Sequence, residues 1–328
     1  MNLPNVSIDA STICQLRCPE CSNTKGIIKN GIIGSGYLRF SDYKKFIKEN
    51  PEIESVELSN WGEIFLNPEL KSILKFSFEK NIKLSAGNGV NFNNVSEDII
   101  ELLVKYRFRY INFSIDGASQ STYSLYRVNG DYNTVIDNIK KLNFFKIKYN
   151  SELPKLSWQF IVFGHNEHEI LAAKKLSEEL NMVFVPKLNF SSFAPVINTK
   201  QVQKDSGLVA ASRTEYKKLT KKDYKRPCCQ LWCSPQISWD GKVLGCCVNK
   251  WKSYGNAFKE GLQSVLENDL YRKTKNILKG IYPIDNSIPC FQCPTFKLIE
   301  SNPINDDEIK AYSNFIHPAE MGIAKTQK

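Results

Sequence analysis

Ten cysteines are the residues of this 328-residue chain best suited to chemistry, and they fall into two groups. Disulfide-rich scaffolds are normally short and secreted, whereas clustered cysteines in a long chain more often bind metal. The clustering therefore indicates two metal sites in a reducing compartment. The first group comprises Cys14, Cys18 and Cys21, and the second comprises Cys228, Cys229, Cys233, Cys246, Cys247, Cys290 and Cys293.

The first group has the spacing Cys14-x3-Cys18-x2-Cys21. Three thiolates on one tight loop can hold three irons of a cubane [4Fe–4S] cluster, which leaves the fourth iron open for a small molecule. A zinc site would need a fourth cysteine or a histidine nearby, and the nearest histidine is His165. The spacing therefore favours an iron–sulfur cluster.

The elements that must position this loop can be read from the pattern up to about Asn189, where strand-like apolar runs alternate with amphipathic helical runs. Such alternation predicts a parallel sheet, and six units make an α/β fold of the partial (β/α)6 TIM-like barrel type, with functional residues at the carboxyl ends of the strands. The expected strands are 6–11, 55–59, 82–86, 110–115, 156–163 and 182–188. The expected helices are 42–49 after Ser41, 69–80 after Pro68, 97–106 after Ser96, 132–148 and 167–180.

The last third of the chain has a different texture. Short strands, glycine turns and cysteines surround one expected helix over 262–278, which predicts a small cysteine-rich α+β domain stabilised in part by metal. We therefore expect a barrel over residues 1–197, a polar linker over 198–226, the cysteine-rich domain over 227–296 and an irregular tail over 297–328.

The cysteine loop and the segments after the expected strands resemble the radical S-adenosylmethionine (SAM) superfamily, whose signature is CxxxCxxC after the first strand of a partial barrel. The chain departs from it at Glu20, where the family usually has an aromatic residue. The resemblance implies SAM-binding roles for Gly62 and Glu63 in a glycine–glutamate motif that contacts the methionine amino group, Asn88 in a polar turn after the third strand, Ser114 and Asp116 as ribose contacts, and Arg127 as the partner of the SAM carboxylate.

This resemblance also implies a reaction. The reduced cluster passes one electron to SAM, which is cleaved to methionine and a 5′-deoxyadenosyl radical, and that radical abstracts hydrogen from a substrate C–H bond. An external electron donor such as flavodoxin or ferredoxin is implied as a partner.

The second cysteine group resembles the SPASM/twitch extension of radical SAM enzymes, through Gly241-x4-Cys246, Gly255-Asn256 and Cys290-x2-Cys293. It implies an auxiliary [4Fe–4S] cluster saturated by four thiolates, which would accept or relay an electron. No cysteine follows Cys293, so a second auxiliary cluster is not expected. The implied ligands are Cys228, Cys246, Cys290 and Cys293. The spare thiols, Cys229, Cys233 and Cys247, are either small buried side chains or include a hydrogen-atom donor.

Composition leaves one alternative of another class. The net charge is +10 and the pI is about 9.0, so a non-catalytic basic zinc-ribbon protein that binds nucleic acid fits the last third taken alone. The lysines are spread along the chain without interleaved aromatic residues, which makes a nucleic-acid partner the less favoured prediction. No apolar run approaches the ~18 residues of a membrane helix, and no signal-peptide pattern occurs, so a cytoplasmic protein without a membrane partner is expected.

The substrate stays open between a small molecule and a peptide. A single saturated auxiliary cluster is similar to that of twitch-type dehydrogenases that oxidise an amino-cyclitol alcohol. Because the first expected strand begins close to residue 1, we expect no added peptide-recognition domain, which weakens but does not exclude the resemblance to peptide-modifying members.

Overall fold

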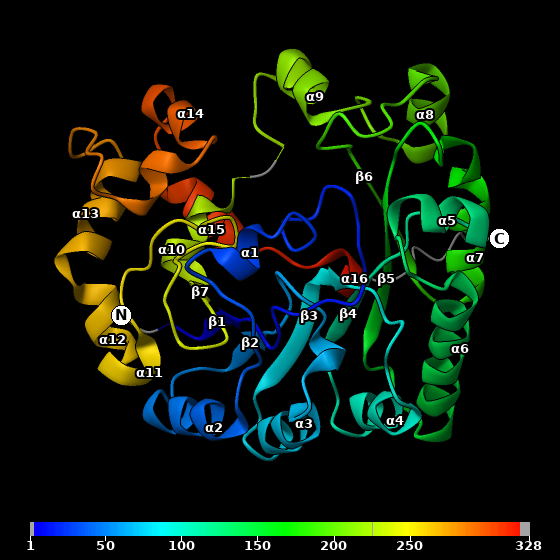
Figure 1. Cartoon of the computed structure of the whole chain (residues 1–328), viewed down its shortest axis with the longest axis horizontal. Coiled ribbons are helices and arrows are strands. Elements are labelled where there is room, and N and C mark those ends of the chain that lie inside the picture. Colours follow the sequence, from blue (N-terminus) through cyan, green and yellow to red (C-terminus); the bar gives the residue numbers. More distant parts are fainter. Residues whose placement is uncertain (1–2, 225, 322–328) are drawn as a thin grey trace. The chain divides into compact units, whose positions relative to one another are not determined.

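The computed structural model describes residues 3–224 and 226–321 and has an α/β architecture (Figure 1). The strands are β1 Asn5–Ile8, β2 Ser55–Glu57, β3 Lys83–Val90, β4 Tyr110–Ser114, β5 Lys155–Ile161, β6 Val183–Lys187 and β7 Gln236–Ile237. The helices are α1 Ile27–Asn30, α2 Phe40–Glu49, α3 Leu70–Glu79, α4 Glu97–Lys105, α5 Gln120–Tyr126, α6 Tyr132–Lys148, α7 Ile170–Glu179, α8 Thr199–Ser206, α9 Arg213–Thr220, α10 Gln230–Cys233, α11 Ala257–Glu260, α12 Leu262–Glu267, α13 Asp269–Leu278, α14 Phe296–Ser301, α15 Asp306–Ser313 and α16 Pro318–Met321, and the 3-10 turns are η1 Ile64–Leu66, η2 Glu167–Glu169, η3 Pro227–Cys229 and η4 Pro289–Gln292.

The chain divides into two compact units, and each is assembled from separate segments. The first unit contains residues 3–13, Gly26–Leu84 and Arg226–Phe315, and the second contains Cys14–Lys25, 85–224 and 316–321. These two units are not the same division of the chain as the predicted domains with boundaries at residues 197, 226 and 296. Those boundaries stay predictions.

In the first unit the strand order is β2-β1-β7, and both pairings are parallel. Side chains alternate between the two faces of a strand, so Val6 and Ile8 lie on one face of β1 while Ser7 and Asp9 lie on the other. Strand β7 comes from the cysteine-rich part of the chain, and it pairs with β1 from Ser7 opposite Gln236 onwards. The sheet thus joins the N-terminal strand to the region that follows residue 226.

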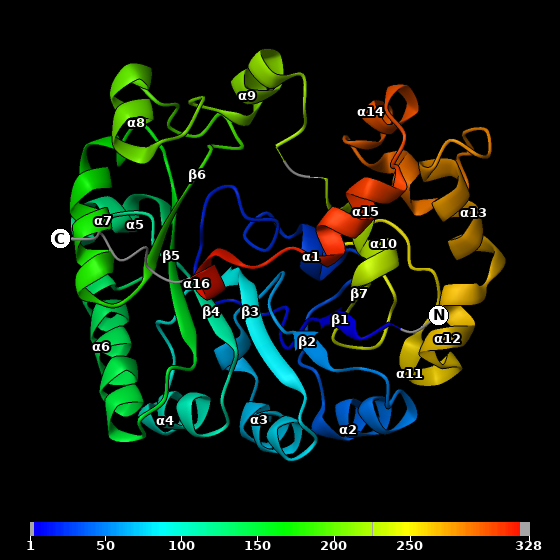
Figure 2. The same ribbon diagram turned by 180° about the vertical axis from the view of Figure 1, so that it is seen from behind.

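In the second unit the strand order is β6-β5-β4-β3, again with parallel pairings, and β3, β4 and β5 run side by side (Figure 2). Trp158 on β5 is fully buried and donates its indole N–H to the carbonyl oxygen of Ile115 at 2.7 Å. The opposite face of the strands carries polar side chains, among them Asn112 and Ser114 on β4 and Gln159 on β5. This polar face continues to the ends of the strands that are expected to carry function.

The α/β prediction is confirmed: all six expected barrel strands are present, with bounds that shift by a few residues. Helix starts agree less well, because α2 begins at Phe40 after Arg39 rather than after Ser41. The single helix expected over 262–278 is wrong, since Asn268 adopts an extended conformation and separates α12 from α13. The irregular tail is also wrong over its described part, which contains α15, α16 and all of α14 except its first residue.

Among the residues that the structure describes, no helix combines the length and apolar character needed to cross a membrane.

Candidate functional site

The three cysteines of the first group lie together on one loop of the second unit. The Cys21 N–H donates to the carbonyl oxygen of Cys18 at 3.1 Å, which closes a tight turn between them. All three side chains pack against one apolar cluster formed by Leu16, Tyr126, Ile161 and Phe163, and Cys18 is itself buried. Three convergent thiols in apolar surroundings form a donor set that fits three irons of a [4Fe–4S] cluster.

Arg127 lies against this loop, held by Asp116. Its Nε and Nη2 each lie 2.7 Å from Oδ2 of Asp116, and its Nη1 lies 3.7 Å from Sγ of Cys18. Burial raises the pKa of Cys18, while the neighbouring Arg127 cation opposes that rise. Burial disfavours the Arg127 cation, yet Asp116 and Cys18 hold the pKa of Arg127 above its ordinary value. The arginine is therefore a fixed cation at the cysteine loop, and its predicted role as partner of the SAM carboxylate stays a prediction.

The polar side chain that reaches the cysteine loop from β3 is Asn91, which the sequence analysis missed. Its Nδ2 lies 3.6 Å from Sγ of Cys14, and its Oδ1 accepts a hydrogen bond from Nε2 of Gln15 at 2.8 Å. The turn expected at Gly87-Asn88-Gly89 is wrong, because β3 continues to Val90 with a register shift after Ala86. Asn88 is exposed within the strand, and the polar contact falls three residues further on.

Ser114, at the end of β4, is buried in a hydrogen-bonded network. Gln159 Nε2 donates to Ser114 Oγ at 3.4 Å, and Asn112 Nδ2 donates to Gln159 Oε1 at 3.1 Å. Gly89 has a φ of +116°, and a Cβ at that position would lie 2.3 Å from Ser114 Oγ. Only glycine fits this close approach, so Gly89 faces the predicted site residue Ser114 across β3 and β4.

Gly62 and Glu63 belong to the first unit, where they pack on the backbone just before the cysteine loop. A Cβ on Gly62 would lie 2.3 Å from the carbonyl oxygen of Ser11, and Glu63 donates its N–H to the carbonyl oxygen of Ile13 at 2.8 Å. The Glu63 side chain is buried and accepts from the Phe65 N–H at 3.4 Å. Since Ile13 is joined directly to Cys14, this packing ties the glycine–glutamate motif to the start of the loop.

The four thiols predicted to bind an auxiliary cluster come together in the first unit. Burial raises the pKa of Cys228 well above its usual value, and the neighbouring Cys246, Cys290 and Cys293 raise it further. The same four cysteines line a small, almost wholly apolar cavity with Leu231 and other residues. Four thiols that line one apolar cavity are a donor set suited to a bound iron–sulfur cluster.

The spare thiols lie beside this group but face other neighbours. Cys233 Sγ donates to the carbonyl oxygen of Ile309 in α15 at 3.5 Å. Burial raises the pKa of Cys229 to about 11, with Glu308 and Cys233 as the next causes. Helix α15 packs against α10, the helix that ends at Cys233 (Figure 1).

Among residues 3–224 and 226–321, no three His, Cys, Asp or Glu side chains lie close enough to share a single metal ion. In a [4Fe–4S] cluster each thiolate binds its own iron, which requires thiols further apart than the ligands of one ion.

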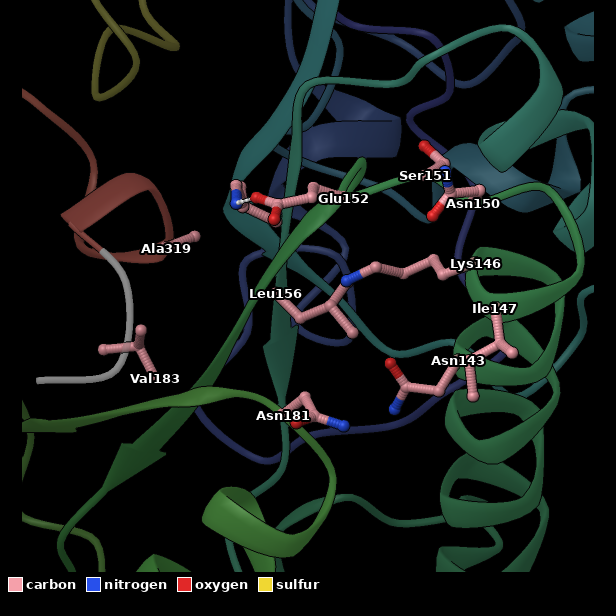
Figure 3. Close-up of a pocket in the computed structure, with 11 residues that line it drawn as sticks. Asn143, Lys146, Ile147, Asn150, Ser151, Glu152, Leu156, Asn181, Val183 and Ala319 are labelled. Atoms are coloured by element: carbon pink, nitrogen blue, oxygen red, sulfur yellow. Dashed lines mark hydrogen bonds and ion pairs between the residues drawn. The ribbon is translucent and has the colours of Figure 1, made fainter. Parts of the chain in front are cut away.

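A cavity of about 520 Å³ lies in the second unit at the amino ends of β5 and β6, the opposite ends of these strands from those expected to carry function (Figure 3). The Lys146 side chain extends from α6 toward Leu156 (Figure 3). Burial lowers the pKa of Lys146, and the positive charge of Lys155 lowers it further.

Comparisons with known proteins agree with this geometry. Residues 228–294 match the SPASM family, an iron–sulfur cluster-binding domain. SuiB of Streptococcus suis bound to S-adenosylmethionine is similar at a TM-score of 0.61 and 14% identity, over 97% of this chain and 75% of that chain. SuiB bound to the precursor peptide SuiA is similar at a TM-score of 0.55 and 15% identity, over 90% of this chain and 70% of that chain. No curated protein matched the sequence. The family match thus assigns residues 228–294 to the SPASM family of iron–sulfur cluster-binding domains, and the fold of the chain is similar to that of SuiB.

Proposed function

We propose that the chain is a radical SAM oxidoreductase that removes hydrogen from a substrate C–H bond. The carrying observation is the convergence of Cys14, Cys18 and Cys21 on one apolar cluster, with the Arg127 cation fixed beside them. When bound there, a reduced [4Fe–4S] cluster supplies the electron that cleaves SAM to methionine and a 5′-deoxyadenosyl radical.

Each part of the chain has a task in this proposal. The three thiolates hold the cluster, and the apolar side chains around them exclude water. Glu63 contacts the methionine amino group, with Gly62 allowing its close packing, while Arg127 faces the carboxylate. Asn88 and Ser114 contribute polar contacts from β3 and β4. The ribose contact first assigned to Asp116 conflicts with its geometry, because its side chain is fully buried and paired with Arg127.

In the SPASM domain, we assign Cys228, Cys246, Cys290 and Cys293 as ligands of the auxiliary [4Fe–4S] cluster. Their shared apolar cavity, which Cys229 does not line, supports this set over one that contains Cys229. A cluster held by four thiolates has no open iron, so its proposed task is to accept or relay an electron. An external donor such as flavodoxin or ferredoxin would reduce the protein.

A peptide is the substrate class that we favour. Support comes from the likeness to SuiB bound to the precursor peptide SuiA, which extends over 90% of this chain. The second candidate is a hydroxyl-rich small molecule such as a cyclitol, favoured by the polar face of Asn112, Ser114 and Gln159. Hydrogen-bonding side chains of this kind suit the hydroxyl groups of a cyclitol.

The test is anaerobic SAM turnover after cluster reconstitution, with 5′-deoxyadenosine measured by mass spectrometry. Cys18→Ala should abolish its dithionite-driven formation because the cluster loses one of three ligands, while Cys229→Ala serves as the matched control and should retain it. Undiminished 5′-deoxyadenosine from Cys18→Ala would refute the assignment.

The assignment of the SAM-binding motif can be tested separately by equilibrium dialysis of labelled SAM. Glu63→Gln should weaken binding about tenfold or more with iron content unchanged, since one charge-assisted contact contributes ~1.5–3 kcal/mol. Exposed Glu69→Gln is the control. Equal SAM affinity in Glu63→Gln and the parent would show that the motif is misassigned. Product analysis with candidate peptides and cyclitols then distinguishes the substrate classes.

A further inference from the structure

The guanidinium of Arg127 is held in one orientation by a single carboxylate oxygen. Its Nε and Nη2 both contact Oδ2 of Asp116 at 2.7 Å, which leaves Nη1 as the group nearest Cys18, at 3.7 Å from Sγ. The side chains are 13% and 0% exposed, so water competes little for these contacts. The fork geometry of arginine thus fixes which N–H faces the sulfur.

Asp116 is in turn fixed by the strand that follows it in the sheet. Its Oδ1 accepts from the Ile161 N–H at 2.7 Å, and its carbonyl oxygen accepts from Nδ2 of the buried Asn166 at 3.2 Å. Asn166 also donates to the Ile161 carbonyl oxygen at 2.9 Å. With both carboxylate oxygens engaged, Asp116 is built to hold Arg127 and has little capacity for another partner.

The cysteine loop is tied to the same place by its backbone. The Arg17 N–H, next to Cys18, donates to the carbonyl oxygen of Val128 at 3.0 Å, next to Arg127. This bond keeps the sulfur and the guanidinium in register, independently of the side-chain contacts.

From this geometry we infer that Arg127 donates an N–H···S hydrogen bond to the Cys18 thiolate and thereby raises the reduction potential of the cluster at Cys14, Cys18 and Cys21, with Asp116 acting as a positioning residue. Hydrogen bonds to cluster sulfurs and nearby positive charge stabilise the reduced, more negative state. The inference rests on the proposed function, because it requires a cluster on this loop.

The experiment is an EPR-monitored redox titration of the reconstituted full-length protein, without SAM. Arg127→Gln should shift the potential of one of the two clusters to more negative values. At a fixed potential, its ratio of reduced to oxidised cluster should fall at least tenfold, which corresponds to 59 mV for a one-electron couple. Arg17→Ala is the control, since it removes an exposed charge from the same loop, and it should shift the potential far less.

Two further variants keep the test decisive. Arg127→Lys preserves the positive charge without the planar guanidinium, and it should shift the reduction potential less than Arg127→Gln does. It also takes the place of Arg127→Gln if that variant fails to hold iron. In an Asp116→Asn background, adding Arg127→Gln should change the potential much less than it does in the parent, because the arginine is no longer held against Cys18.

Unchanged potentials in Arg127→Gln and Arg127→Lys, with SAM binding weakened, would overturn the inference and leave Arg127 as a SAM ligand only. An equal shift on adding Arg127→Gln with and without Asp116 would overturn the positioning role. Failure of the proposed function is recognised separately, because the parent protein would then show only one cluster signal or none.

Discussion

Replacing Cys228 with alanine should remove the auxiliary cluster, whereas replacing the adjacent Cys229 should not. Sequence alone places the two thiols side by side, and the structure separates them by their neighbours. Cys228 lines the apolar cavity with Cys246, Cys290 and Cys293, while the larger influences on the pKa of Cys229 are burial, Glu308 and Cys233. Two [4Fe–4S] clusters correspond to about 8 iron atoms per chain, so Cys228→Ala should fall to about 4 while Cys229→Ala stays near 8.

Stability should separate the same two variants. Metal binding in a small cysteine-rich domain is coupled to folding, so Cys228→Ala should lower the unfolding midpoint of the first unit clearly. Cys229→Ala loses only the burial of a small side chain, which costs about 1 kcal/mol.

Iron and sulfide quantification, together with anaerobic urea unfolding, measures both effects. Loss of four irons in Cys229→Ala with full loading of Cys228→Ala would refute the ligand assignment. If Cys229→Ala keeps all its iron and SAM cleavage but loses product, the spare thiol is a hydrogen-atom donor instead.

Three other perturbations follow from the packing. Gly62→Ala should destabilise the protein by about 2 kcal/mol or more, because its Cβ would overlap backbone atoms. The control Gly207→Ala has open space around the new Cβ and only a left-handed φ opposes it, so it should cost about 1 kcal/mol. Equal midpoints of the two variants in urea unfolding would contradict this expectation. Burial raises the pKa of Asp9 from 3.8 to about 8, so the folded state binds the extra proton and the parent should lose stability as pH rises from about 4 to 8, by at most about 6 kcal/mol. Asp9→Asn should flatten this dependence, and parallel stability–pH curves for parent and variant would disprove the mechanism. Lys146→Met should raise the midpoint of thermal unfolding, because the protonated amine of Lys146 is partly buried near another lysine. Lys140 is exposed, so Lys140→Met should leave the midpoint nearly unchanged. Equal midpoints of the two variants would contradict the electrostatic argument.

Much of the fold follows from the sequence because its signals are local. The alternation of strand and helix depends on apolar periodicity, and all six expected strands appear. Cysteine spacing similarly predicts the loop at Cys14, because three ligands within eight residues need no knowledge of distant contacts. The strength of such signals does not depend on tertiary packing.

The parts that sequence did not predict depend on contacts between distant segments. Asn91 reaches Cys14 only because β3 extends past the expected turn, and Asp116 serves Arg127 because Ile161 and Asn166 hold its backbone and one carboxylate oxygen. Helix α15 was missed because its polar sequence has no continuous apolar stripe, although Asn305 and Glu308 form a capping box at its start. The capping-box pattern of Asn305 and Glu308 was the sequence signal that could have predicted the start of this helix.

The pairing of β1 with β7 sets the order in which the protein can be completed during synthesis. Residues 5–8 are synthesised well before their partner strand, which begins at Gln236, more than 200 residues further along the chain. Until then one edge of β1 is unpaired, and unpaired strand edges can pair with other strands. The cysteine loop follows β1 in the chain. A long-range closure of this kind also slows folding. Completion of the sheet around β1 must therefore wait until residues 236–237 have been made.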